Sequence, residues 1–232
     1  MSLTYTNLIG KELIEHTNRV LNNDGGEILT YFIDSTQGWK YLDTYTYNGE
    51  TYIKIKNNIR TYSIGNSEES KEFIRSIFNR LDAIIDLDFE EMDNDNGSDI
   101  DIYSINYSSS FETNGVGQAS MQNSEAGSWW DILWKNTDSN YNLIPGDKNT
   151  LIHEIGHTFG LSHPNNDPFN KQLTTDDTVM SYNSSEDGWN FWFTDNDIDA
   201  LKHIWGREND TGALKIDDIS NNLKYRKSEN ND

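Results

Sequence analysis

The chain has 232 residues, 39 of them acidic and 18 basic, which gives a formal net charge of -21, and it contains no cysteine. A field of that sign repels phosphates, so neither nucleic acid nor an anionic membrane surface is expected as a partner. The absence of thiols excludes a disulfide framework, a redox thiol site and a thiolate-bound zinc.

The N-terminal region predicts neither a signal peptide nor a membrane span. Residues 1–25 are polar and mixed in charge, and no stretch of the chain approaches 18 apolar residues. Aromatic residues make up 12% of the chain and can fill a core. We therefore expect a globular monomer rather than a disordered chain.

The first third of the chain predicts a helix, a strand, a hairpin and a second helix. Apolar residues recur at helical spacing within 8–21 and within 68–86. Residues 27–34 (EILTYFID) are typical of a strand. The dipeptide Asn48-Gly49 lies between alternating runs in 38–64 and indicates a hairpin.

Two further strands are predicted at 87–92 and 99–105. Isoleucines alternate with polar residues in the second strand, which predicts that only one of its faces is buried. The loop between them, Asp93–Ser98 (DNDNGS), resembles a calcium-binding loop, but its glycine comes one place early for an EF-hand. A polar turn is favoured there, and calcium has no clear motif in the sequence.

The remaining elements are a loop that contains a short strand, a strand, a helix, an irregular segment and a final helix. Their predicted ranges are 106–128 with the short strand at Gly117–Met121, then 129–135, 148–159, 164–193 and 194–206. Thr194 followed by Asp197 is a capping pattern, and Gly206 ends the last helix. Residues 207–232 are polar and predict a tail or a linker.

Three of the five histidines fall within eleven residues, His153–His163 (HEIGHTFGLSH). Positions four apart lie on one face of a helix, so His153 and His157 can point at one metal ion. Glu154 lies about 100° further round the helix. From there its carboxylate can reach a metal-bound water without ligating the metal.

Gly160 predicts a sharp exit from this helix, because glycine tolerates positive φ. Such a turn can bring His163 back as a third ligand. Three neutral imidazoles with one open position form a catalytic rather than a closed structural zinc site. The other two histidines, His16 and His203, are expected to be ordinary helix residues.

The pattern HExxHxxGxxH resembles the metzincin zinc metalloproteases, and more narrowly the serralysin-like bacterial proteases. Pro164 follows the third histidine, Thr178–Tyr182 (TVMSY) is similar to the Met-turn, and Thr194–Gly206 is similar to the helix that closes the catalytic domain. The resemblance is strong over 149–206 and loose over 27–148. Serralysins usually continue into glycine-rich calcium-binding repeats, and this sequence contains none.

The resemblance implies an α/β (α+β) catalytic domain of two lobes over residues 1–206. The upper lobe, about 1–163, would hold a twisted mixed sheet and the active-site helix. The lower lobe, about 164–206, would be small and irregular and would end in the final helix.

The resemblance also implies roles for further residues. Zn²⁺ is the implied cofactor, with Met180 as an apolar floor beneath it. Tyr182 would be a switchable additional ligand and a donor to the transition state. Substrate would pair with an edge strand made of Gly117, Gln118, Ala119, Ser120 and Met121.

The implied activity is that of a secreted zinc-dependent endopeptidase, which hydrolyses peptide bonds in proteins through a metal-activated water with Glu154 as general base. Two other functions stay open: a non-catalytic binding module that is stabilised by zinc, and a metal-dependent amidase of another substrate. The helix at 8–21 could also be a prosegment that lies across the cleft.

Overall fold

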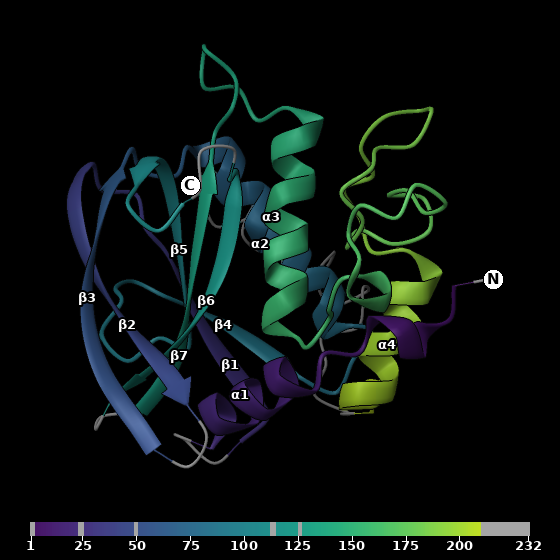
Figure 1. Cartoon of the computed structure of the whole chain (residues 1–232), viewed down its shortest axis with the longest axis horizontal. Coiled ribbons are helices and arrows are strands. Elements are labelled where there is room, and N and C mark those ends of the chain that lie inside the picture. Colours follow the sequence, from purple (N-terminus) through teal and green to yellow (C-terminus); the bar gives the residue numbers. More distant parts are fainter. Residues whose placement is uncertain (1–2, 23–25, 49–50, 112–114, 125–126, 210–232) are drawn as a thin grey trace, which may run out of the picture.

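The structure is a computed structural model. It describes residues 3–22, 26–48, 51–111, 115–124 and 127–209, with the side chains of 41–59 left out. Helices and strands follow one another along the chain as Figure 1 shows. In chain order they are η1 (Tyr5–Leu8), α1 (Lys11–Leu21), β1 (Ile28–Ile33), β2 (Gly38–Asn48), β3 (Thr51–Ser63), α2 (Glu68–Asp82), β4 (Asp88–Met92), β5 (Ile100–Ser108), β6 (Gly117–Ser124), β7 (Gly127–Lys135), α3 (Pro145–Thr158), η2 (Pro164–Asn166) and α4 (Asp195–Trp205), where η marks a 3-10 helix.

A seven-stranded mixed sheet is built around β5. One edge of β5 pairs in parallel with β7, and the other edge pairs in parallel with β1 and antiparallel with β3. Strand β4 pairs in parallel with β1, and β2 pairs antiparallel with β3. Strand β6 pairs antiparallel with β7, on the edge of β7 that faces away from β5. The sheet therefore ends at β6 in the direction of the helix α3, which contacts both β6 and β7.

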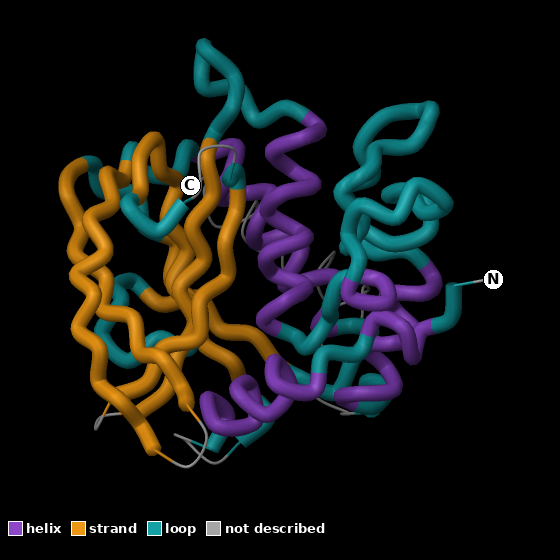
Figure 2. The backbone as a smooth tube through the Cα atoms, in the orientation of Figure 1, coloured by secondary structure: helices purple, strands orange, loops and turns teal. Residues whose placement is uncertain are grey.

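The helices gather on one side of the sheet, to the right of the strands in Figure 2. Apolar residues of α2 recur every three or four positions, and Ile74, Ile77 and Phe78 are fully buried. The Phe78 ring stacks on Tyr31 of β1 with a centroid separation of 4.0 Å. This layer of apolar side chains fixes α2 and α3 against the strands, so the sheet is the support of the site described below.

The predicted α/β class with a twisted mixed sheet is confirmed, and the ends of several elements shift. Strand β6 runs to Ser124, beyond the predicted short strand, because all of its residues pair with β7. The β2–β3 hairpin forms as predicted, although its turn at 49–50 lies outside the described residues. Residues 93–98 form a polar turn, in which Asn94 Oδ1 accepts a hydrogen bond from the Asn96 amide.

The prediction of a half-exposed strand at 99–105 was wrong. Residues 100–105 are all buried. The isoleucines of one face join the main core, and Tyr103 and Ile105 of β5 pack with Leu133 in a second apolar cluster. Apolar side chains pack over both faces of this central strand, so polar residues in its sequence do not imply an exposed face.

Two aspartates are buried beside each other in this sheet. Asp101 lies directly opposite Asp131 in the β5–β7 pairing, and they are 5% and 3% exposed. The Gln122 side chain donates a hydrogen bond of 2.8 Å to Asp131. Burial raises the pKa of Asp131 to about 7, and burial together with the charge of Asp131 raises the pKa of Asp101.

We predict that Asp131 makes the protein less stable as pH rises from about 4 to about 7. Over this range the folded state binds more protons than the unfolded state, so the free energy of unfolding falls as the pH rises. Asp131→Asn should remove a component on the order of 3–4 kcal/mol from that fall. Urea unfolding between pH 4 and 8 measures the effect, with Asp176→Asn at an exposed carboxylate as control. Parallel curves for the wild type and Asp131→Asn would contradict the prediction.

Candidate metal centre and cleft

Helix α3 presents the first part of the histidine motif. Pro145 occupies its first turn, and its last turn leads into Gly160, whose φ is 91°. A Cβ at Gly160 would lie 2.5 Å from Cγ1 of Ile14, so this position needs glycine both for its conformation and for space. The chain then reverses and returns along the helix to His163, as predicted from the glycine in the sequence.

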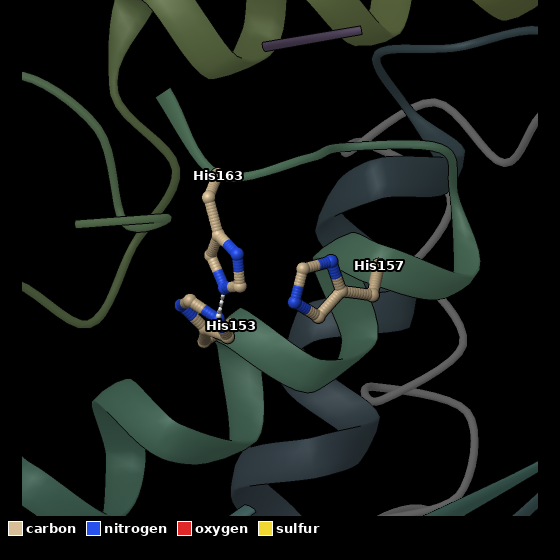
Figure 3. Close-up of side chains that lie close together, drawn as sticks. All are labelled: His153, His157 and His163. Carbon is tan, nitrogen blue, oxygen red and sulfur yellow. Dashed lines mark hydrogen bonds between the residues drawn. The ribbon is translucent and has the colours of Figure 1, made fainter. Parts of the chain in front are cut away.

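The three histidines converge at one point, as Figure 3 shows. Each offers a ring nitrogen, and these nitrogens all lie within 4.8 Å of one another. The Nε2 atoms of His153 and His163 are 3.2 Å apart. Two nitrogens bound at about 2.0–2.1 Å to one tetrahedral ion are separated by roughly 3.3 Å, so this spacing suits zinc.

Backbone carbonyls determine which nitrogen of two rings faces the centre. His153 Nδ1 donates to the Val179 carbonyl at 2.9 Å, and His157 Nδ1 donates to the Leu161 carbonyl at 2.7 Å. Each ring therefore keeps the Nε2 lone pair free for a metal. Burial lowers the pKa of all three imidazoles, to about 4 for His157, so that they are neutral ligands at pH 7. The donor set thus fits a divalent transition metal.

Glu154 lies beside this centre and is 6% exposed. Burial raises its pKa to about 8, and the backbone N–H of Ala119 on β6 partly offsets that rise by hydrogen bonding. The carboxylate occupies space that Gly117 leaves free, because a Cβ at Gly117 would lie 2.4 Å from Glu154 Oε1. Strand β6 therefore positions Glu154, a contact that the sequence did not reveal.

Met180 and Tyr182 lie on the chain segment that faces α3. Met180 is fully buried, and its Sδ packs against the helix at Gly156. The Tyr182 ring is 44% exposed, with its centroid 5.3 Å from that of His153 and 5.0 Å from that of His163. Burial, and then the charge of Glu154, raise the pKa of its hydroxyl. The structure thus brings both residues to the centre.

A cleft of about 930 Å³ opens beside His153 and Glu154. Several of its walls are large apolar side chains exposed by more than a third: Val116, Ile144, Phe169, Tyr182, Trp189 and Phe191. Of the five residues predicted for the substrate edge strand, Gly117 lines this cleft, whereas Gln118, Ala119, Ser120 and Met121 do not. The aromatic walls come from irregular segments, where no periodicity in the sequence could indicate them.

Helix α4 supports the metal centre from a distance. The predicted capping box at its start is present, with Thr194 and Asp197 bonded to each other. The buried Asp197 carboxylate also accepts hydrogen bonds from Thr178 Oγ1 and, at 3.0 Å, from the Val179 amide. Because the Val179 carbonyl receives His153 Nδ1, Asp197 orients a ligand ring through the intervening residue.

We predict that Asp197→Asn weakens zinc binding 10- to 100-fold and lowers stability by about 1–3 kcal/mol. The Asp197 carboxylate accepts from four donors: Thr178 Oγ1, the Val179 amide, and the amide and hydroxyl of Thr194. An amide cannot accept from all four, so the segment that contains Val179 loses its anchor. Competition with a chromophoric chelator measures the affinity, and Asp195→Asn in the same helical turn is the control. Equal zinc affinity in the two variants would show that Asp197 does not support the ligand.

The other two histidines lie outside the centre. His16 is buried in α1, its ring stands edge-on to Trp130, and its Nε2 lies 2.9 Å from the Trp129 carbonyl. His203 lies in α4 beside Tyr5. Among the described residues, none of those that line the cleft belongs to α1. The helix packs instead against β7 and α3, so the structure does not support a prosegment across the cleft.

A mixed sheet that supports a helix, with three imidazoles beside a cleft, is the arrangement of a metallopeptidase catalytic domain. Residues 18–194 match the family model Reprolysin_5, described as metallo-peptidase family M12. The match covers most of the sequence, and the chain belongs to this family. Membership implies a zinc-dependent peptidase that acts on proteins or peptides.

No sufficiently similar curated protein was found by sequence comparison. Within the described part of the chain, no helix has both the length and the apolar character that a membrane crossing requires.

Proposed function

We propose that the protein is a zinc-dependent endopeptidase of the metzincin type and, within it, serralysin-like. The observation that carries the proposal is the placement of Glu154 beside three convergent imidazole nitrogens at the wall of one cleft. A structural zinc site needs no buried carboxylate of raised pKa next to its ligands. The Met-turn residues Met180 and Tyr182 at the same centre support the metzincin assignment.

His153, His157 and His163 would hold the zinc. When bound, zinc polarises the scissile carbonyl and makes a nucleophile available near neutral pH. A zinc ion next to the Glu154 carboxyl would favour its ionised form, so that it would accept a proton from the attacking water and deliver it to the leaving amine. Its burial and its contact with Ala119 hold that carboxylate in place, so little reorganisation is needed during the proton transfers.

The Tyr182 hydroxyl would stabilise the oxyanion of the tetrahedral intermediate, and it could ligate zinc in the resting enzyme. Its ring lies next to His153 and His163 and also lines the cleft. An exposed ring at the edge of a cleft can change position when substrate enters. The Tyr182 hydroxyl would therefore bind zinc in the resting enzyme and the oxyanion during the reaction.

We predict that Glu154→Gln keeps zinc bound but lowers kcat by about 10²–10⁴, because the amide cannot accept the water's proton. Fluorogenic-peptide cleavage and metal analysis of the same preparation measure the two properties. Glu12→Gln on the exposed side of α1 is the matched control. Near-normal turnover in Glu154→Gln would refute its role as general base.

Tyr182→Phe should lower kcat about 10- to 1,000-fold and leave the zinc content unchanged. The ring still fills its place against the histidines, whereas the donor to the oxyanion is lost. Steady-state kinetics separate the effect on kcat from that on KM, with Tyr141→Phe as the control outside the cleft. A change confined to KM would assign Tyr182 to substrate binding alone.

Two other functions remain as outcomes of these assays. A zinc-stabilised binding module would bind metal and cleave no peptide in any assay. An amidase of another substrate would cleave small amides but not folded or denatured proteins. The match to a metallo-peptidase family favours a protein or peptide substrate over another amide.

Substrate would lie extended along β6, whose outer edge is unpaired in the described sheet. The catalytic domain would comprise residues 1–206, with the upper lobe to about 163 and the lower lobe from 164. We also propose that the enzyme is a secreted monomer. Its acidic surface is consistent with solubility outside the cell.

A further inference from the structure

A short N-terminal segment pairs with the turn between the second and third histidines. The amide of Gly10 donates to the Gly160 carbonyl at 2.8 Å, and the amide of Ser162 donates to the Leu8 carbonyl at 2.6 Å. Ile9 and Leu161 form an antiparallel bridge between these two hydrogen bonds. Residues 8–10 are called the N-terminal brace below.

The turn that the brace holds contacts or adjoins two of the three histidines, His157 and His163. Leu161 supplies the carbonyl that accepts the hydrogen bond from His157 Nδ1. Ser162 directly precedes His163. We infer that the N-terminal brace positions His157 and His163 and so raises the affinity of the centre for its metal. This inference rests on the proposed metal site and adds a part of the chain far from the motif to it.

The brace is itself firmly held. Leu8 and Leu161 are fully buried in the main core. The 3-10 helix η1, which leads into the brace, contacts α4 and η2. The two strands of the bridge lie close together, because a Cβ at Gly10 would be 3.2 Å from the Ser162 Cβ. The brace is therefore anchored in the core, and through its hydrogen bonds it holds residues 160–162 in one conformation.

The physical effect expected is preorganisation. Residues 159–163 leave the helix through Gly160 and belong to no helix or long strand. Without the two hydrogen bonds, the segment would sample several conformations, and metal binding would have to restrict them. Groups that orient metal ligands typically change affinity 10- to 100-fold when they are removed.

The decisive comparison is between Gly10→Pro and Gly10→Ala in the full chain. Proline removes the N–H that donates to Gly160, whereas alanine keeps that donor. Both add a Cβ, which would lie 2.7 Å from Leu13 Cδ1 and 3.2 Å from Ser162 Cβ, so alanine controls for this crowding. Because proline also changes the local backbone, a second variant that begins at Lys11 tests removal of the whole brace. Val20→Ala lowers stability from the buried side of α1, leaves the hydrogen bonds of the brace unchanged, and controls for destabilisation.

Zinc affinity is measured by chelator competition at a temperature where circular dichroism shows each variant folded. Cobalt is then used in place of zinc, because its visible absorption reports the number and geometry of the ligands. We expect Gly10→Pro and the shortened chain to bind zinc 10- to 100-fold more weakly, with altered cobalt spectra. Gly10→Ala should bind zinc more tightly than Gly10→Pro, because it keeps the donor to Gly160, and Val20→Ala should keep the wild-type spectrum.

The outcomes separate the two proposals. Wild-type affinity and spectrum in both Gly10→Pro and the shortened chain would overturn the role of the brace and leave the metal site intact. Equal losses in Val20→Ala and Gly10→Pro would also overturn it, because general destabilisation would then explain the effect. Absence of zinc binding in the unaltered chain would overturn the metal site and the inference together.

Discussion

The metal centre depends on two hydrogen bonds that fix the tautomer of two of its three imidazoles. Val179 and Leu161 each present a carbonyl to an Nδ1–H, so the opposite nitrogen of each ring must face the centre. Neither carbonyl belongs to the helix that carries the two histidines. The geometry of the ligands is therefore decided by whatever holds those two carbonyls in place.

The supports come from separate parts of the chain. Asp197, at the start of α4, holds the segment around Val179, and residues 8–10 hold the segment around Leu161. Strand β6 provides the third support, by leaving space at Gly117 for the carboxylate of Glu154 and offering an amide to it. Helix α3 supplies the reactive groups, and its surroundings fix how these groups point.

The sequence was sufficient for those parts of the site that depend on local geometry. The spacing of His153 and His157 places both on one helical face, and Gly160 indicates the turn that returns His163. The sequence was insufficient for those parts of the fold and the site that depend on contacts between distant segments of the chain. The burial of both faces of β5 depends on what packs over the sheet, and the aromatic walls Phe169 and Trp189 lie in segments without periodicity.

The supporting residues show the same limit. Leu8 and Asp197 are ordinary in their local sequence, one in an apolar position and the other in a capping box. Only the three-dimensional structure shows that they act on the ligands. A family resemblance over 149–206 could point to Met180 and Tyr182, but it contained nothing about the brace.

The distance along the chain between these supports has a consequence for the order in which the enzyme matures. During synthesis, helix α3 emerges from the ribosome before residues 178–197, so at that stage the Val179 carbonyl cannot yet fix the ring of His153. Competent ligand geometry therefore follows completion of the domain rather than formation of the helix. A chain that ends before residue 178 lacks one of the two carbonyl contacts that orient the histidine rings.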